Sequence, residues 1–247
     1  MLDGKIVMIT AAAGAGIGFA TVRRSVQEGA TVVINDVHAR RLEEAADTLR
    51  DLTGTRPVAV PGDVSVEADV QRLWDAALAA HGHVDVLVNN AARTIERSIV
   101  DMTDAEWSLV LDVSLTGTFR CLRAALRHML PRRSGAIVNM SSVLGWRAQA
   151  QQSSYAAAKA GVMALTRCAA MEAAPAGVRV NAVAPSLAAN PFLVRATNAE
   201  LLKELTRREP FGRAATPEEI ANVVVFLASD LSSYMTGEVV SVSSQHP

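Results

Sequence analysis

Short runs of apolar and β-branched residues alternate along the chain with longer stretches whose apolar positions recur at helical spacing. Within each short run the apolar residues are continuous, which is typical of strands buried on both faces of a sheet. The predicted strands are Lys5–Thr10, Thr31–Asp36, Pro57–Val60, Val84–Asn89, Ala136–Ser141, Val178–Ala184 and Glu238–Ser243. The predicted helices lie near residues 17–29, 40–52, 66–80, 104–130, 153–174 and 217–228. This alternation predicts an α/β fold: a doubly wound, seven-stranded, mainly parallel sheet with helices on both faces.

Two threonines mark helix starts, and one segment interrupts the alternation. Thr103 and Thr216 each precede acidic residues at the start of a predicted helix, where negative charge is favourable. Residues from about 185 to 210 follow the sixth predicted strand, mix polarity and contain Pro191. A loop of this length at the carboxyl end of a strand predicts a substrate lid. No linker or repeat interrupts the sequence, so residues 1–247 are predicted to form a single domain.

Composition argues against several classes of partner. The chain has 24 basic and 25 acidic side chains and only 4% aromatic residues, so nucleic-acid binding is not expected. No apolar run reaches the ~18 residues that cross a bilayer, and the amino terminus lacks a signal-peptide pattern, so no membrane association is expected. Cys121 and Cys168 form no CxxC pair and have no neighbouring zinc ligands. We therefore expect a cytoplasmic protein without a metal site.

A glycine-rich turn, TAAAGAGIG, follows the first predicted strand and opens the first predicted helix. Gly14, Gly16 and Gly18 lie in this turn. Glycine there lets the backbone approach a pyrophosphate, and the helix amino terminus supplies N–H groups and a partial positive charge. Tight turns without a ligand use glycine too, but the position directly after a first strand favours dinucleotide binding.

Polar residues follow the next three predicted strands, at the edge where ligands bind in open α/β sheets. Asp36, at the end of the second strand, can accept both hydroxyls of an adenosine ribose and would repel a 2′-phosphate, so it favours NAD over NADP. Arg40 and Arg41 follow closely and could weaken that preference. Asp63–Val64 follows the third strand, and Asn89–Ala92 closes the fourth. Taken alone, each of these positions is only a polar turn.

Ser142, Tyr155 and Lys159 carry the strongest chemical signal. Tyr155 and Lys159 are four residues apart in a predicted helix and therefore share one face. A free tyrosine has a pKa of about 10, and we expect the Lys159 ammonium to lower the pKa of Tyr155 and to make the pair a general acid or base. Ser142 follows the fifth strand and can donate a hydrogen bond to a carbonyl oxygen. An ordinary amphipathic helix also produces this spacing, but here it stands behind a glycine-rich turn and several polar strand ends.

Together these motifs resemble the short-chain dehydrogenase/reductase family over essentially the whole chain. The matching segments are TAAAGAGIG, GDV, NNAA, IVNMSS, YAAAK, VNAVAP and TGEVVSV. The resemblance implies a Rossmann-type sheet, NAD or NADP as the cofactor, and a homotetramer. It also implies that Tyr155 exchanges a proton with the substrate oxygen, that Lys159 holds the nicotinamide ribose, and that Ser142 orients the carbonyl. The cofactor-binding residues that it implies are Gly14, Gly16, Ile17, Gly18, Asp36, Asp63, Val64, Asn90, Ala91, Tyr155, Lys159 and Pro185.

The chain departs from the family's usual pattern in several motifs. Ala11 and Ala92 stand where the family usually has glycine, and the tail reads SVSSQHP in place of the frequent VDGG. Ser186 stands at another common glycine position, and Asn190 falls near a usual threonine. The family's catalytic asparagine falls on Ser114, whose shorter hydroxyl we expect to support the proton path modestly, through an additional water. Since the serine, tyrosine and lysine are all present, activity is still expected.

The resemblance implies an oxidoreductase that transfers a hydride between nicotinamide and a carbonyl or secondary alcohol. The chain looks most like bacterial 3-oxoacyl-thioester reductases. Its segment LGWRAQAQQSSYAAAKAGVMALTRC and its tail look like a subgroup linked to acyl-CoA and steroid-ring breakdown, which implies a CoA- or carrier-linked small-molecule substrate. An alcohol or hydroxysteroid dehydrogenase remains an alternative. A non-catalytic NAD(P)-binding sensor or scaffold is a second one.

The remaining apolar and basic residues suggest substrate and subunit contacts. Arg147 and Arg195 could meet an anionic carrier such as a CoA phosphate, although surface arginine is the ordinary interpretation. The candidates for lining an apolar cleft are Leu144, Trp146, Leu187, Phe192, Leu193 and Phe211. The predicted helices at 104–130 and 153–174 carry Ala- and Leu-rich faces broader than one core-facing stripe needs. With the family resemblance, these faces predict one dimer interface and the C-terminal strand a second, and hence a tetramer.

Overall fold

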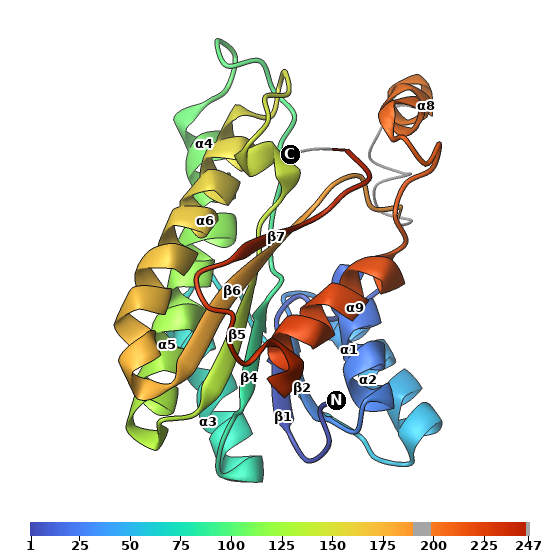
Figure 1. Cartoon of the computed structure of the whole chain (residues 1–247). Coiled ribbons are helices and arrows are strands. Elements are labelled where there is room, and N and C mark those ends of the chain that lie inside the picture. Colours follow the sequence, from blue (N-terminus) through green and yellow to red (C-terminus); the bar gives the residue numbers. More distant parts are fainter. Residues whose placement is uncertain (190–198, 246–247) are drawn as a thin grey trace.

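Seven strands form one sheet in the part of the chain that the structure describes, residues 1–189 and 199–245 of a computed structural model (Figure 1). The strands are β1 (Ile6–Ile9), β2 (Thr31–Asp36), β3 (Val58–Pro61), β4 (Val86–Asn89), β5 (Gly135–Met140), β6 (Val178–Pro185) and β7 (Val239–Val242). Their order is β3-β2-β1-β4-β5-β6-β7, and every neighbouring pair is parallel. The predicted doubly wound α/β fold is confirmed, and the described sheet is parallel throughout.

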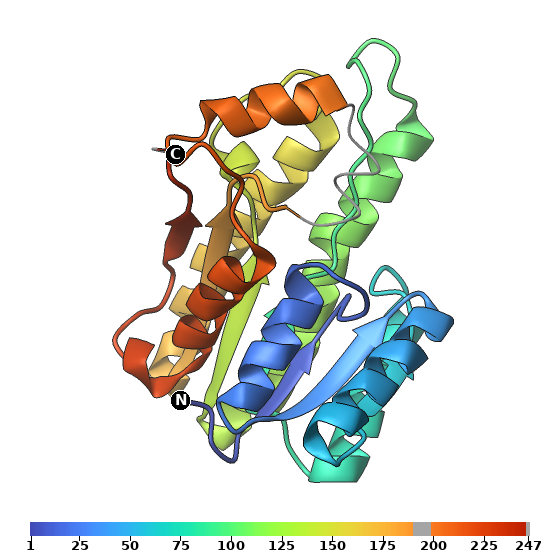
Figure 2. The ribbon, with the colours of Figure 1, turned by 90° about the vertical axis from the view of Figure 1, so that its right-hand side faces the viewer.

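Helices cover both faces of this sheet (Figures 1 and 2). They are α1 (Ile17–Gln27), α2 (Ala39–Thr53), α3 (Glu67–His81), α4 (Asp104–Leu111), α5 (Gly117–Arg132), α6 (Ser153–Ala173), α8 (Ala199–Arg208) and α9 (Pro217–Ala228). Successive residues of a strand point to opposite faces. Val7 and Ile9 pack with α1, α2 and α9, whereas Met8 packs with α3, α5 and α6. Both sides of the central strand β1 are therefore buried, which explains its continuous apolar run.

The two threonines predicted to start helices form complete capping boxes. Thr103 Oγ1 accepts the Glu106 N–H at 3.2 Å, and a Glu106 carboxylate oxygen accepts the Thr103 N–H at 3.0 Å. Thr216 and Glu219 make the same pair of bonds at the start of α9. Each box satisfies two backbone N–H groups that would otherwise lack a partner. Among the described residues, no helix is long and apolar enough to cross a membrane.

The strand order places a reversal of winding at β1. This strand pairs with β2 on one side and with β4 on the other, so the chain winds outward in both directions from it. In open α/β sheets, ligands bind at the carboxyl ends of the strands beside such a reversal. The glycine-rich turn follows β1, and the polar segments after β4 and β5 end at the same edge. The topology therefore brings the predicted motifs together.

Two helices differ from the prediction. The helix expected near residues 104–130 is divided by a π-helical turn, Asp112–Thr116, between α4 and α5. A π turn inserts one residue into a helix, and the apolar spacing does not reveal it. Residues 199–208, expected as part of a lid loop, form α8; the loop assignment was wrong there because mixed polarity outweighed the strong helix formers in AELLKELTRR. The predictions for Asn190, Phe192, Leu193 and Arg195 lie outside the described residues.

Candidate active site

The turn between β1 and α1 leaves the amino terminus of α1 open. Gly16 is the N-cap residue, and no side chain caps the first helical turn. A Cβ at Gly14 or Gly16 would meet no atom within 4 Å, whereas a Cβ at Gly18 would lie 2.2 Å from the carbonyl oxygen of Ala11 and 2.6 Å from Nδ2 of Asn90. Gly14 and Gly16 therefore border open space, and Gly18 permits close packing. Uncapped N–H groups beside open space fit the pyrophosphate of a dinucleotide.

Ala11 lies in the left-handed region, with φ of 48°, at the base of this turn. That conformation costs a residue with a side chain about 1–2 kcal/mol, whereas glycine loses about 0.5–1 kcal/mol more entropy on folding. We therefore expect Ala11→Gly to raise the Tm by up to about 4 °C in a thermal unfolding scan. The control Ala13→Gly, at an ordinary backbone conformation, should lower the Tm. An equal fall of the Tm in both variants would contradict backbone strain at Ala11.

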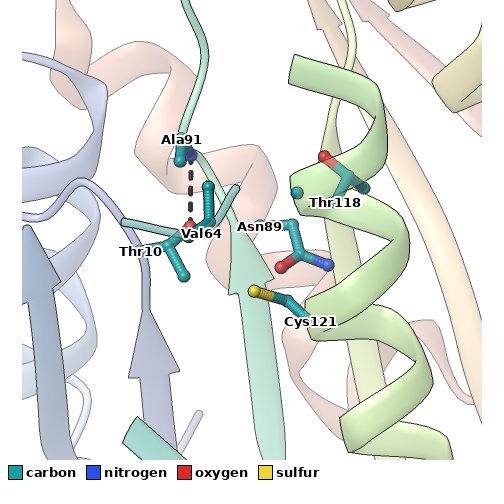
Figure 3. Close-up of a pocket in the computed structure, with 7 residues that line it drawn as sticks. Thr10, Val64, Asn89, Ala91, Thr118 and Cys121 are labelled. Carbon is teal, nitrogen blue, oxygen red and sulfur yellow. Dashed lines mark hydrogen bonds between the residues drawn. The ribbon is translucent and has the colours of Figure 1, made fainter. Parts of the chain in front are cut away.

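Asn90 and Ala91 join the end of β4 to the end of β1. The Asn90 side-chain amide donates to the carbonyl oxygens of Thr10 at 3.1 Å and Ala11 at 3.0 Å. The backbone N–H groups of Asn90 and Ala91 donate to Thr10 Oγ1 at 3.0 and 3.1 Å, and Figure 3 shows the second of these bonds. The structure therefore places both residues beside the predicted cofactor turn, where they fix its backbone.

Asp36 lies at the carboxyl end of β2 and contacts the same turn. It is 6% exposed, and its carboxylate accepts the N–H of Ala13 at 3.2 Å and that of His38 at 2.9 Å. Burial raises the pKa of Asp36 above its usual value, and the Ala13 hydrogen bond and the Arg41 guanidinium, 3.9 Å away, act in the opposite direction. Arg40 instead points toward Glu44 on exposed surface. Of the two arginines in question, Arg41 is thus the one beside Asp36.

Asp63, Val64 and Pro185 complete the predicted cofactor set. Asp63 follows β3, and its Oδ1 accepts the backbone N–H and the hydroxyl of Ser65 at 2.8 and 2.7 Å. Val64 is 6% exposed and packs against the start of α5. Pro185 is the last residue of β6 and pairs with Val242 of β7. All three therefore lie at the carboxyl edge of the sheet, as the sequence predicts.

Ser142, Tyr155 and Lys159 converge beside the end of β5. The Ser142 side chain lies near the Tyr155 hydroxyl, whose pKa it lowers, and its Oγ accepts the N–H of Leu144 at 3.2 Å. Tyr155 and Lys159 lie one turn apart on α6, with Lys159 Nζ 5.5 Å from the centre of the Tyr155 ring. Lys159 is 1% exposed and donates to the carbonyl oxygen of Met140 at 2.6 Å. The structure thus brings the three predicted catalytic side chains into one cluster.

The pKa of Tyr155 differs from the sequence-based expectation. Burial raises the pKa of Tyr155 to about 12, against the lowering effect of the nearby Ser142 side chain. Burial also lowers the pKa of Lys159 to about 8. The expectation that Lys159 lowers the pKa of Tyr155 is wrong for this structure, because loss of hydration outweighs the favourable contacts and the ammonium is directed at Met140. At neutral pH Tyr155 keeps its proton, as a general acid must.

Ser114 lies in the π turn and is fully buried. Its hydroxyl donates to the carbonyl oxygen of Arg93 at 3.1 Å and accepts the Arg93 N–H at 2.9 Å. A serine hydroxyl has a single hydrogen to donate, and here the backbone after β4 takes it. In this structure Ser114 therefore fixes the loop that follows β4. Its expected part in the proton path stays a prediction.

Gln152 is a buried polar residue near this cluster that the sequence patterns did not single out. It lies just before α6 and is 6% exposed. Its Oε1 accepts the hydroxyl of Thr94 at 2.8 Å, and its Nε2 donates to Glu96 at 3.1 Å. Its position three residues before Tyr155 was the available signal. Through it, the loop after β4 is tied to the helix that carries Tyr155.

A cavity of about 140 Å³ lies beside the ends of β6 and β7. Its lining residues are Ser186, Glu209, Phe211, Arg213, Ala215, Glu219, Val242, Ser243 and Ser244. Phe211 is the described member of the predicted apolar cleft that reaches this cavity, although its ring is 76% exposed. Leu144 and Leu187 are half-buried, Trp146 is exposed, and none of the three lines the cavity. The apolar cleft expected from these residues stays a prediction.

The fold and this cluster define an α/β oxidoreductase that acts on hydroxyl and carbonyl groups with a nicotinamide cofactor. The chain belongs to the short-chain dehydrogenase/reductase family. The family model described as "Enoyl-(Acyl carrier protein) reductase" matches residues 11–244. The resemblance inferred from the sequence motifs is thereby confirmed.

Several relatives match along nearly their whole length. The (5R,7aS)-5-hydroxy-7a-methyl-1-oxo-2,3,5,6,7,7a-hexahydro-1H-indene-carboxyl-CoA reductase of Mycobacterium tuberculosis is 58% identical over 100% of this chain and 95% of its own. The cis-4-hydroxycyclohexanecarboxylate dehydrogenase of Sinomonas cyclohexanicum is 46% identical over 96% and 94%. The 3-oxoacyl-acyl-carrier-protein reductase of Thermotoga maritima is 39% identical over 98% and 97%. Among solved structures, levodione reductase superposes with a TM-score of 0.94 at 32% identity, covering 99% of this chain and 98% of the other.

Proposed function

We propose that this chain reduces the ketone of a cyclic, CoA-linked substrate, with Tyr155 as the proton donor. The observation that carries the proposal is the cluster of Ser142, Tyr155 and Lys159, in which the buried Lys159 Nζ lies 5.5 Å from the centre of the Tyr155 ring. A positioned general acid of this kind contributes about 10²–10⁴-fold to a rate. The similarity to a hexahydroindene-carboxyl-CoA reductase supports the choice of substrate class.

The residues present fit a nicotinamide dinucleotide. The open amino terminus of α1, with Gly14 and Gly16, would receive the pyrophosphate, and Asp36 would accept the adenosine ribose hydroxyls. Lys159 would contact the nicotinamide ribose. When bound, the cofactor supplies the hydride for carbonyl reduction. Asn90 would hold the backbone of this turn in place through its hydrogen bonds to the carbonyl oxygens of Thr10 and Ala11.

The proton comes from the chain itself. Ser142 would donate a hydrogen bond to the carbonyl oxygen and hold it near the Tyr155 hydroxyl. Tyr155 would deliver its proton to that oxygen as negative charge develops there. Since burial raises the pKa of Tyr155 to about 12, the proton stays on the phenol until the substrate oxygen becomes basic. At neutral pH Tyr155 is therefore present in the protonated form that carbonyl reduction requires.

A substrate comparison tests the proposed function. Purified protein would be given cyclic keto- and hydroxy-carboxyl-CoA thioesters, linear 3-oxoacyl-CoA, hydroxysteroids and the matching free acids, while the absorbance of reduced cofactor is followed. We expect kcat/KM for a cyclic CoA thioester to exceed that of its free acid by at least about tenfold, equivalent to about 1.4 kcal/mol. Equal kcat/KM values for the thioester and the free acid would contradict recognition of the CoA moiety. Turnover confined to hydroxysteroids or simple alcohols would favour the dehydrogenase alternative, and cofactor binding without turnover would favour a sensor.

NAD is the proposed cofactor because the Asp36 carboxylate would lie against a 2′-phosphate. We expect kcat/KM with NADH to exceed kcat/KM with NADPH. Asp36→Ala should lower this NADH-to-NADPH ratio by at least about tenfold. Glu44→Ala removes an equally charged but exposed side chain from α2 and serves as the control, with the ratio unchanged. A native preference for NADPH, which Arg41 could support, would contradict this role of Asp36.

We also propose a homotetramer in the cytoplasm. Trp107, Leu109 and Phe119 on α4 and α5 are 38–41% exposed, more than helices facing only their own core require. Leu231 and Tyr234, just before β7, are 67% and 103% exposed and support a second contact region. Light scattering should give four times the 26.1 kDa chain mass, and a monomer mass at micromolar concentration would refute the tetramer. The free thiols of both cysteines support a reducing compartment.

A further inference from the structure

The last described residues of the chain connect two segments that are far apart in the sequence. After β7 the chain continues toward the end of the molecule where α8 lies (Figures 1 and 2). There the Gln245 amide is used at both ends: Nε2 donates to a carboxylate oxygen of Glu209 at 3.1 Å, and Oε1 accepts from the Arg147 guanidinium at 2.9 Å. Gln245 therefore bridges the end of α8 to the loop between β5 and α6.

Glu209 is the hydrogen-bond acceptor at one end of this bridge. The residue follows α8 by one position and is 6% exposed. In the described part of the chain its carboxylate accepts from two neutral groups, the Ser244 hydroxyl at 2.7 Å and the Gln245 amide at 3.1 Å. A buried carboxylate without hydrogen-bond partners destabilises the folded state, so loss of either contact would cost free energy.

The other end of the bridge leads directly to the candidate catalytic serine. Arg147 is five residues after Ser142, at the end of a tight turn in which the Gly145 N–H donates to the Ser142 carbonyl oxygen at 2.9 Å. The Arg147 N–H donates to the Val143 carbonyl oxygen, also at 2.9 Å. Arg147 therefore ends a short, hydrogen-bonded turn that begins at Ser142. Its hydrogen bond to Gln245 is one of the contacts that hold that turn.

The bridge also borders the cavity beside β6 and β7. Glu209 and Ser244 both line it, as does Ser186, which directly follows the last residue of β6. The nucleotide-binding turn lies at β1, β2 and β4, away from this cavity. The cavity begins beside Pro185 of the predicted cofactor set but lies away from the glycine-rich turn, so the bridge borders the part of the candidate site that is left for substrate.

We propose that Gln245 is a positioning residue for substrate binding: its amide holds the end of α8 and the Ser142 loop in register, and so sets the wall against which the CoA-linked ketone binds. The inference rests on the proposed function for its substrate. The turn after Ser142 keeps its own backbone hydrogen bonds without Gln245, so we expect loss of the bridge to affect substrate binding more than the chemical step.

Exchanging the amide of Gln245 and the carboxylate of Glu209 tests the hydrogen bond between them. Q245E keeps an oxygen for Arg147 but loses the donor to Glu209 and sets two carboxylates together. E209Q keeps one acceptor oxygen, which can serve Ser244, and replaces the oxygen that faces Gln245 with an amide donor. In the double variant Q245E/E209Q, a glutamine at position 209 donates to a glutamate at position 245, and the bridge re-forms with its polarity reversed.

We expect Q245E to raise the KM for the CoA-linked substrate about tenfold, equivalent to about 1.4 kcal/mol. The kcat and the KM for the cofactor should stay within about twofold of wild type, and the double variant should recover most of the loss. Q71E is the matched control: Gln71 donates to Asp75 at 2.8 Å in the same chemistry, on exposed surface of α3. It should change none of these constants.

A wild-type substrate KM in Q245E, or a double variant as impaired as Q245E, would overturn the role of Gln245. If no CoA-linked ketone is turned over by wild-type protein, the proposed function has failed, and hydrogen exchange then decides the bridge on its own. Faster exchange in α8 in Q245E, restored in the double variant and absent in Q71E, supports the bridge. Unchanged exchange in Q245E contradicts it.

Discussion

Replacing Tyr155 with phenylalanine is expected to lower kcat by at least about 10²-fold, while the Kd for the cofactor changes by no more than about twofold. The substitution removes the hydroxyl that would protonate the substrate oxygen, and it keeps the ring beside Lys159. Single-turnover kinetics at saturating substrate would measure the loss in the chemical step. Cofactor fluorescence would measure binding.

The chain provides its own control for this experiment. It has two tyrosines, and the other, Tyr234, is fully exposed just before β7. Tyr234→Phe removes the same atom far from the candidate site and should leave kcat unchanged. Near-wild-type turnover in Tyr155→Phe would remove Tyr155 as the proton donor.

Gly18→Ala is expected to have the largest effect on stability. Its Cβ would lie 2.2 Å from a backbone carbonyl oxygen of Ala11, which cannot move without displacing the turn after β1. Overpacking of this kind costs about 3 kcal/mol, and we expect the Tm to fall by roughly 6–12 °C with loss of cofactor binding. Thermal unfolding of the cofactor-free protein, followed by a cofactor titration, would measure both effects.

Gly16→Ala separates packing from ligand binding in the same turn. A Cβ at Gly16 meets no atom within 4 Å, so the Tm of the cofactor-free variant should stay within about 2 °C of wild type. Cofactor affinity should nevertheless fall, because the methyl group would enter the space proposed for the pyrophosphate. If Gly16→Ala binds the cofactor as tightly as wild type does, the dinucleotide does not lie over this turn.

The fold could be predicted from the sequence because strands that are buried on both faces have continuous apolar runs. All seven predicted strands are present, and the glycine-rich turn, Asp36 and Asn90 lie at the edge where the strand order places them. The i, i+4 spacing of Tyr155 and Lys159 was sufficient to place them on one face of α6. These features depend on local spacing, which a single sequence displays.

What the sequence could not supply depends on three-dimensional burial. The π turn at Ser114 leaves no periodic mark, and its hydroxyl bonds to a residue 21 positions away. The direction of the Tyr155 pKa is set by desolvation, which no spacing reports. Gln245 and Glu209 are 36 positions apart and meet only because the chain after β7 reaches the end of α8.

Transfer of isotope from substrate to cofactor tests the central claim most directly. A hydroxy form of the CoA-linked substrate, carrying deuterium on the carbinol carbon, would be incubated with oxidised cofactor in ordinary water, and the reduced nicotinamide examined by mass spectrometry. Direct hydride transfer predicts one deuterium in each reduced cofactor, formed by the wild-type protein and at least about 10²-fold more slowly by Tyr155→Phe. Oxidation that yields reduced cofactor without deuterium, or at the same rate in Tyr155→Phe, would contradict the account.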